Sequence, residues 1–543
     1  MATRSLSLLL GLQFYCTVAV YGEIFSSIAR LQSLYASSSS ILQQLDDYIG
    51  KEEERLQVLR SIREEVSALQ DIAPDTGLTV PEHPIGAYHM IKALSHLNQT
   101  ISTATVSTNV FQSYLQALSQ PLPSESDFRG AISAILRLQA IYRLPTHDLM
   151  EGMVRGNTAK RLNPSDAVAI AKIARKSTNY RHLTVEWLKE AYEAYVTRRE
   201  QSGLDLKVHL LNITKEYIQY SDWMNAWLYV NKAKETYPHD DEVMLVYRDI
   251  EGTIKHATTV GLSLHSFHGA PGYSEDGWWK NYSSLCRGDQ DAITSNWKSS
   301  FCSLTPTSIP FSPVKTEVLS TRPFIAIFHD VLSNSEAIKF KSEAFNMLLR
   351  ANVGDPGKGF VSEARVGQLT WLYDTNPNVH KISQRVMDIT GLDVTIRNNL
   401  SSSEPFQVVN YGIGGQYEPH FDVYADRSAL LDLPSFLKGS GERLATFLFY
   451  LNDVTEGGAT VFPTAGVRVP AIKNSAAFWY NLWRSGENDP MTLHAGCPVL
   501  LGQKWVANKW IREHGQEFRH SCGSHPDSVH HEFPEHRWVM NRA

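Results

Sequence analysis

The sequence is poor in cysteine and has no large excess of one charge, and each shortage excludes a class of protein. It has five cysteines among 543 residues, and no two of them stand in the Cys-x-x-Cys spacing of zinc sites. The formal net charge of -6 gives no electrostatic basis for binding nucleic acid. After Gly22, no apolar run approaches the roughly 20 residues that a membrane-spanning helix needs. We therefore expect no cysteine-held metal, no nucleic-acid partner and no membrane span.

Residues 1–22 have the features of a cleavable secretory signal. Arg4 precedes an apolar run, and small residues follow at Val20 and Gly22. A membrane anchor is the alternative, but the run is too short to span a bilayer. A secretory route agrees with the N-glycosylation sequons of the chain, which stand at Asn98, Asn212, Asn281 and Asn399.

The remaining cysteines predict disulfides. Removal of the signal takes Cys16 with it and leaves an even number of cysteines in a secreted chain. These are Cys286, Cys302, Cys497 and Cys522. The simplest pairing is sequential, so that Cys286 bonds to Cys302 and the last two cysteines bond to each other.

The chain is too long for one hydrophobic core, so about three domains are expected. The first, residues 23–143, is predicted to be helical. Between Ile28 and Val66, nine of twelve positions of a heptad seam are apolar. A long helix with such a stripe either forms a coiled coil between two copies or packs in a bundle within one chain, and the sequence leaves both open.

Residues 144–255 are expected to form a second helical domain. Five residues follow the spacing of a tetratricopeptide repeat: Tyr217, Ala226, Val230, Ala233 and Pro238. The helices expected at 167–176 and 184–195 read as a degenerate partner repeat. Such helix pairs stack into a concave face, and the many tyrosines here suit a polyproline II peptide.

The stretches that flank the C-terminal domain have the composition of connecting chain. Residues 256–315 are rich in Gly, Ser and Pro and read as a linker clamped by the expected Cys286–Cys302 bond. Residues 523–543 contain several histidines, which are more typical of a solvated tail than of a metal site. The domain between them is expected to cover residues 316–522.

Two histidines and one aspartate give the strongest functional signal in the chain. Side chains two apart on a strand project to the same face, so His420 and Asp422 are able to bind one metal together. His494 supplies a second imidazole from a distant stretch, as when two strands face each other across the mouth of a barrel. Three ligands on one face of an octahedral ion leave three positions free, which is the arrangement of non-haem Fe(II) oxygenases.

Lys504 begins a stretch with strand character that carries unusual polar residues. Lys504, Asn508 and Trp510 alternate onto one face of this strand. A lysine that points into a small barrel is costly to bury without an anionic partner. The distal carboxylate of 2-oxoglutarate is such a partner, while Asn508 and Trp510 are expected to form pocket wall.

These motifs resemble those of the α subunit of collagen prolyl 4-hydroxylase, an Fe(II)- and 2-oxoglutarate-dependent dioxygenase. The similarity is dense over residues 322–522 and looser toward the start of the mature chain. The resemblance implies that His420, Asp422 and His494 bind Fe(II) and that Lys504 anchors the 2-oxoglutarate carboxylate. It also implies the sequential pairing of the cysteines.

The resemblance extends to fold and reaction. It implies a multidomain α + β protein whose residues 316–522 form a double-stranded β-helix of the jelly-roll type. The implied activity is that of a procollagen-proline 4-dioxygenase, which hydroxylates proline in X-Pro-Gly collagen-like peptides with O2. L-ascorbate would restore Fe(II) after uncoupled turnovers.

A partner protein is expected from the same resemblance. The chain ends at Ala543 without an ER-retention tetrapeptide of the Lys-Asp-Glu-Leu type, so another protein is expected to hold it in the endoplasmic reticulum lumen. In the resembled family, that protein is protein disulfide isomerase, the β subunit. The implied assembly is a tetramer of two α and two β subunits, in which residues 23–143 join the α subunits.

Some positions depart from the resembled pattern or have two interpretations. Tyr411 precedes a Gly-rich turn and belongs either to the co-substrate pocket or to the core. Ala364 stands where the family usually has a tyrosine, and the loop after Cys286 is less basic than its counterparts. The alternatives are therefore a non-catalytic subunit that binds proline-rich peptides, a hydroxylase of a non-collagen secreted substrate, and a lysyl hydroxylase. Halogenation is not expected, because Asp422 fills the halide position.

Overall fold

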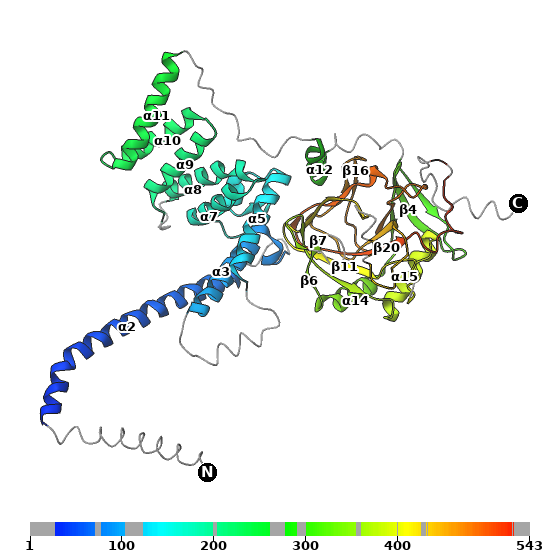
Figure 1. Cartoon of the computed structure of the whole chain (residues 1–543), viewed down its shortest axis with the longest axis horizontal. Helices are drawn as coiled ribbons and strands as arrows, with labels where there is room; N and C mark the ends of the chain where they lie inside the picture. The colour runs from blue at the N-terminus through cyan, green and yellow to red at the C-terminus, as the bar shows by residue number, and fades with distance from the viewer. Residues whose placement is uncertain are drawn as a thin grey trace, which may run out of the picture.

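The computed structural model describes a helical N-terminal part and a β-rich C-terminal part (Figure 1). The described residues are 28–70, 78–103, 123–198, 204–260, 277–289, 300–353, 360–398, 400–424, 430–431, 433–523 and 525. The expected signal (1–22), Cys16, Asn399 and nearly all of the expected tail (523–543) lie outside them. The mixed α + β architecture is confirmed. Within the described ranges, no helix combines the length and apolar character needed to cross a bilayer.

The N-terminal part consists of helices apart from one short hairpin, β1 (Met153–Val154) with β2 (Asn157–Thr158). Its helices are α2 (Ile28–Gln70), η2 (Val80–Glu82), α3 (Pro84–Thr103), α5 (Glu125–Tyr142), α6 (Thr146–Met150), α7 (Pro164–Lys176), η3 (Arg181–Leu183), α8 (Thr184–Arg198), α9 (Leu206–Gln219), α10 (Trp223–Thr236) and α11 (Asp241–Thr259). The helices expected at 167–176 and 184–195 lie within α7 and α8.

Helix α2 extends away from the rest of the chain (Figure 1). Four apolar residues of its heptad seam remain exposed to solvent within one chain: Leu42, Leu45, Ile49 and Leu56. Packing among the described residues therefore leaves this stretch of the seam only partly covered.

Short polar side chains begin the helices of the stack α7–α11. Asn163 caps α7 ahead of a proline at the first helical position. Asp205, Asp222 and Asp240 begin α9, α10 and α11, and each accepts a hydrogen bond from the backbone N–H three residues later. Such caps satisfy amide groups that have no partner within the helix.

Small residues allow the capped helices to pack closely. Ala191, Ala226 and Ala233 are fully buried, and α9 and α10 form one of the most extensive helix contacts of the chain, matched by α7 and α8. Trp187 of α8 fills the centre of the stack, where its indole N–H donates to Gln139 of α5 at 2.8 Å. Helix α5 is therefore part of the helical core.

The β-rich part contains two principal antiparallel sheets. The larger has the strand order β3 (Phe301–Thr305), β4 (Val314–Thr321), β5 (Phe324–His329), β17 (Ala476–Tyr480), β13 (Arg443–Tyr450), β20 (Lys504–Arg512), β11 (Phe406–Tyr411), β10 (Gln368–Leu372) and β6 (Leu349–Arg350). The smaller has the order β16 (Val467–Val469), β15 (Thr460–Phe462), β18 (His494–Gly496), β12 (Gln416–His420) and β9 (Arg365–Val366).

The remaining elements flank these sheets. They are the strand pairs β14 (Glu456–Gly457) with β19 (Val499–Leu501) and β7 (Asn352–Val353) with β8 (Phe360–Val361), and the helices α12 (Gly277–Arg287), α14 (Asn334–Phe345), α15 (Pro377–Thr390) and η6 (Pro490–Thr492).

Each face of the large sheet has its own core, because alternate side chains of a strand point to opposite faces. One face packs against α14 and α15, where Phe340 and Val386 meet Phe406 and Phe447. The other core contains Val409, Val506 and Trp479 of the large sheet with residues of the small sheet. The space between the two sheets is thus largely filled by apolar side chains.

The cysteine pairing predicted from the sequence is wrong. Cys286 of α12 bonds to Cys497, next to β18 and 211 residues away, while Cys302 and Cys522 are free and exposed. Helix α12 packs on β15 and β16, which holds Cys286 beside β18, whereas Cys302 lies on the edge strand β3 of the other sheet. The expectation that a Cys286–Cys302 disulfide closes a loop within residues 256–315 is therefore wrong. This stretch instead contributes helix α12 and strand β3.

The disulfide predicts a linked peptide in a non-reducing digest. We expect Cys286 and Cys497 in one peptide pair, and Cys302 modified by an alkylating reagent without prior reduction. Cys286→Ser should lower the free energy of unfolding by about 2–5 kcal/mol, because the closed loop is long. The control Cys302→Ser, at an exposed position, should change it by at most about 0.5 kcal/mol. A peptide that links Cys286 to Cys302 would contradict this assignment.

Candidate metal and carboxylate site

Strand pairing brings the two histidines together. Strand β12 ends at His420 and β18 begins at His494, and these residues are direct partners in the antiparallel register. Asp422 lies two residues beyond the end of β12, so it is placed by the chain after the strand and not by the strand itself. One potential ligand atom from each of the three residues lies within 4.8 Å of the others. The convergence expected from the sequence is therefore present.

Backbone carbonyls fix the orientation of both imidazoles. Nδ1 of His420 lies 2.8 Å from the Glu418 carbonyl, and Nδ1 of His494 lies 2.9 Å from the Thr492 carbonyl. Because a carbonyl oxygen only accepts, each Nδ1 carries the proton and each Nε2 offers its lone pair. These Nε2 atoms are 3.9 and 3.5 Å from the Asp422 carboxylate oxygens.

The charge states of the cluster suit metal binding. Burial lowers the pKa of His420 to about 3, because a charged imidazole would lose its hydration there. Burial alone would raise the pKa of Asp422, but interactions with the His494 and His420 rings and with the Arg443 guanidinium outweigh it and lower that pKa to about 2. The Thr446 hydroxyl also donates to Asp422 at 2.7 Å. At neutral pH, His420 is therefore a neutral donor and Asp422 an anionic one, as a divalent metal requires.

Lys504 points into the same space from the start of β20. It is 3% exposed, and its Nζ lies 3.5 Å from the Thr460 hydroxyl. The rings of Tyr411 and Tyr450 lie 5.9 and 5.6 Å from Nζ, near the limit of a cation–π contact. Among the ion pairs of the described residues, none joins Lys504 to a carboxylate. Burial accordingly lowers the pKa of Lys504 from 10.5 to about 7.

A small cavity of about 50 Å³ connects Lys504 to the three potential metal ligands. Asn508 and Trp510 line it as well, so the expected alternation along β20 is confirmed. Two imidazoles and a carboxylate match the donor set of Fe(II) oxygenases. A buried ammonium without a counter-ion fits an anionic ligand. The residues present therefore fit both a divalent metal and a carboxylate.

Tyr411 and Ala364 take different places. Tyr411 of β11 is 6% exposed, belongs to the core between the sheets and also lines the cavity, so both sequence interpretations describe part of its environment. Ala364 is not among the residues that line the cavity. Its carbonyl accepts a hydrogen bond from the Glu418 N–H at 2.8 Å, a contact that any residue type makes.

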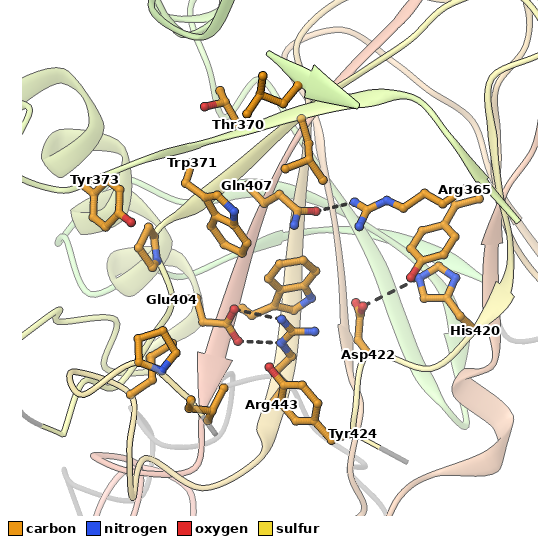
Figure 2. A pocket seen from close by; sticks show the side chains of 18 of the residues that line it. Arg365, Thr370, Trp371, Tyr373, Glu404, Gln407, His420, Asp422, Tyr424 and Arg443 are labelled. Atoms are coloured by element: carbon orange, nitrogen blue, oxygen red, sulfur yellow. Dashed lines mark hydrogen bonds and ion pairs between the residues drawn. The ribbon is translucent and has the colours of Figure 1, made fainter. Parts of the chain in front are cut away.

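A larger groove of about 720 Å³ opens beside His420 and Asp422 (Figure 2). In it, Arg443 donates two hydrogen bonds to Glu404, at 2.6 and 2.9 Å. The Arg443 guanidinium also lies 3.8 Å from the centre of the Trp510 ring. These contacts give the groove a rigid, charged and aromatic wall next to the potential metal ligands.

Sequence reasoning missed most residues of this groove. Arg365 donates to Gln407 at 2.5 Å and stacks over Tyr417, whose ring lies parallel to His420 at 3.5 Å. Arg443 begins a strand of otherwise buried residues, and a charge at the edge of an apolar run was the available signal. The partners lie far apart in the sequence, so no local spacing predicted the pairs.

Comparison with known proteins gives matches at both ends of the chain. Residues 27–156 match the family described as Prolyl 4-Hydroxylase alpha-subunit, N-terminal region, and residues 406–512 match the 2OG-Fe(II) oxygenase superfamily. The chain is 34% identical over 525 residues to prolyl 4-hydroxylase subunit alpha-1 of Homo sapiens, which covers 92% of this chain and 95% of that protein. Subunit alpha-3 of Homo sapiens is 33% identical over 555 residues, with 94% and 95% covered.

A solved structure also matches the chain. It is the viral collagen prolyl hydroxylase of Paramecium Bursaria Chlorella virus-1, which is 25% identical in sequence. The match covers 35% of this chain and 95% of the viral chain, with a TM-score of 0.26.

The unpaired charge of Lys504 predicts a stabilising substitution. Lys504→Met should raise the melting temperature, because it removes a buried charge but keeps the volume. The pKa of Lys504 is about 7 in the folded chain and ordinary in the unfolded one, so the unfolded state binds more protons between these values. The stability of the wild type should therefore rise with pH in this window. The increase in melting temperature caused by Lys504→Met should become smaller as the pH rises.

Thermal unfolding at about pH 6.5 and about pH 9 would measure this change. Lys339→Met, at an exposed position on α14, serves as the control and should leave the melting temperature nearly unchanged at both values. A lower melting temperature for Lys504→Met than for wild type at the lower pH would contradict the prediction.

Proposed function

The chain belongs to the family of prolyl 4-hydroxylase alpha subunits, and from this premise we propose that it hydroxylates proline in X-Pro-Gly collagen-like peptides. It is a 2-oxoglutarate- and Fe(II)-dependent dioxygenase, since residues 406–512 match that superfamily. The family and the type of reaction follow from these matches, and the peptide substrate is what we propose beyond them.

One observation carries the proposed reaction: an open three-ligand cluster shares one cavity with a buried lysine that has no carboxylate partner among the described residues. A structural metal site is normally closed by four protein ligands, whereas this cluster has three and leaves room for other molecules. A subunit that only binds peptides gains nothing from burying Lys504, since the uncompensated charge lowers stability. A non-catalytic role is therefore disfavoured.

In this proposal, His420, Asp422 and His494 hold Fe(II) through two Nε2 atoms and one carboxylate oxygen. Lys504 pairs with the distal carboxylate of 2-oxoglutarate, and Tyr411 forms part of the pocket wall. The bound metal, with 2-oxoglutarate and O2, supplies the oxidising chemistry, and the protein supplies orientation and a cavity with little water. The Glu418 and Thr492 carbonyls keep both imidazoles turned toward the metal.

The peptide would approach through the groove beside Asp422. The Trp371, Tyr373 and Trp510 side chains offer flat surfaces for an extended proline-rich chain, which has little conformational entropy left to lose. We assign residues 144–255 to a TPR-like peptide-binding domain, since buried alanines and capped helix pairs support that architecture. Residues 316–522, with sheet strands from Phe301 onward, would form the double-stranded β-helix.

The exposed stripe of α2 supports a role of residues 23–143 in joining two copies, because Leu42, Leu45 and Leu56 remain about half exposed in the described structure. The proposed assembly pairs two such α subunits with two protein disulfide isomerase β subunits in the endoplasmic reticulum lumen. L-ascorbate is the proposed reductant that maintains Fe(II).

A turnover assay on the full chain, assembled with its β subunit, tests the reaction. With Fe(II), O2 and ascorbate, we expect 2-oxoglutarate decarboxylation that is stimulated by a Pro-Pro-Gly repeat peptide. The peptide should gain one oxygen on proline, located by fragmentation mass spectrometry. His420→Ala should abolish both reactions. Lys504→Met should raise the 2-oxoglutarate requirement by at least about 100-fold, whereas Lys339→Met should not.

Each negative result in this assay favours a different alternative function. Absence of peptide-stimulated decarboxylation would favour the peptide-binding scaffold. Oxygen found on lysine would favour lysyl hydroxylation. Turnover with a proline-rich peptide that lacks the Pro-Gly sequence, but none with the collagen-like one, would favour a non-collagen substrate.

The hydroxyl of Thr446 gives a second test, of the metal site alone. Thr446→Val keeps the shape of the side chain but removes the hydrogen bond to Asp422. We expect Fe(II) affinity to fall by about 10–100-fold, because partners of metal ligands orient them. Thr316→Val is the control, since that hydroxyl is equally buried and bonds only a carbonyl on β4. Equal affinities for both variants would show that the Thr446 hydroxyl does not orient a metal ligand.

A further inference from the structure

Helix α5 belongs to the helical core, yet it also contacts the chain directly beside both strands that carry the histidines. Arg137 is 2% exposed, and its guanidinium donates to the Gly414 carbonyl at 2.6 Å, just before β12. Tyr142, at the end of the same helix, donates to the Pro498 carbonyl at 2.6 Å, just after β18. One helix therefore holds the chain at the same end of both strands.

These two contact points lie next to each other. The Gly414 N–H donates to the Val499 carbonyl at 2.8 Å, and the Val499 N–H donates to Gly415 at 3.1 Å. Together they close the base of the β12–β18 ribbon, whose opposite end carries His420 and His494. The position of the base thus determines where the two imidazoles meet.

Helix α5 packs so closely on the chain beside β12 and β18 that two positions there have no room for a side chain. Gly414 has a positive φ of 67°, and a Cβ at this position would lie 2.5 Å from the Cβ of Ala134 on α5. Gly457 would similarly meet the Tyr142 hydroxyl at 2.7 Å. Glycine is therefore required at both places so that the helix can approach the backbone. Such close approach transmits a shift of α5 directly to the ribbon.

Arg137 also fixes the neighbouring strand. Its second nitrogen pairs with Glu363 at 2.6 Å, in the segment that leads into β9. Strand β9 pairs with β12, and its Arg365 stacks over Tyr417, which in turn stacks on His420. A continuous series of contacts therefore runs from the helical core to a potential metal ligand.

We infer that Arg137 and Tyr142 are positioning residues that set the spacing of His420 and His494, so that the helical part of the chain determines the metal affinity of the β-rich part. This inference rests on the proposed ligand set. It predicts that loss of these contacts weakens metal binding although neither side chain touches the metal.

Binding of Co(II), a probe with visible absorption, to the full-length assembled protein tests the inference. We expect the Co(II) dissociation constant to rise in Arg137→Met, by up to the about 10–100-fold known for direct partners of metal ligands, and to rise less in Tyr142→Phe. Hydrogen exchange of residues 413–420 should also accelerate in Arg137→Met. Tyr142→Phe removes a single hydroxyl and keeps the test valid if Arg137→Met does not fold.

Matched controls separate positioning from general stability. Arg385 makes the same type of contacts as Arg137, to the Val331 carbonyl and the Glu336 carboxylate, but links α15 to α14. Arg385→Met should lower the melting temperature and leave Co(II) affinity within about twofold of wild type. Tyr88→Phe, which removes a buried hydroxyl bonded to Asp166, serves in the same way for Tyr142.

Two results would overturn the inference. The first is that Arg137→Met and Tyr142→Phe both bind Co(II) with an affinity within about twofold of wild type. The second is that Arg385→Met loses as much Co(II) affinity as Arg137→Met. His420→Ala distinguishes these failures from failure of the ligand set. If that variant binds Co(II) as tightly as wild type, the proposed ligands are wrong, and the inference falls with them.

Discussion

The antiparallel pairing of β12 with β18 is the constraint on which the site depends. In this register His420 stands opposite His494, and a slip of one residue would turn one imidazole to the other face of the sheet. The pairing is irregular between Tyr417 and His420, so the ladder alone does not specify it. The Cys286–Cys497 bond and the contacts of α5 hold the same ribbon from outside. Helices α5 and α12 thus support two short strands from outside their sheet.

Burial has opposite effects on the charged groups of the site. It keeps His420 neutral, which favours metal binding, and it strips Lys504 of hydration without supplying a counter-ion. The second effect reduces the stability of the ligand-free chain. The same isolation strengthens an ion pair with any carboxylate that enters, because the local dielectric constant is low. The burial of Lys504 therefore lowers the stability of the ligand-free chain and raises its affinity for a carboxylate ligand.

The clustering of His420, Asp422 and His494 could be predicted from the sequence, because residue chemistry and close spacing along the chain are local properties. The reason given for Asp422 was wrong, since β12 ends at His420 and strand alternation does not place the aspartate. Lys504, Asn508 and Trp510 line one cavity as their spacing indicated. The cysteine pairing failed because closeness along the chain does not determine closeness across two sheets. Arg137 was not predicted for a related reason. A charged residue on a helix is typical of an exposed surface, and only the tertiary packing shows that this side chain is buried.

Strand β20 is the last strand of the described residues but lies in the middle of the large sheet, between β13 and β11. Until it emerges from the ribosome, those two strands have open edges, and the sheet exists as two unconnected halves. Pairing across such sequence distances is slow, and unpaired edges favour association with other chains. Closure of the large sheet and the arrival of Lys504 therefore coincide, because Lys504 is the first residue of β20. A nonsense mutation between the end of β13, at residue 450, and residue 504 would therefore release a polypeptide whose β11 and β13 keep open edges, which favours aggregation as well as inactivity.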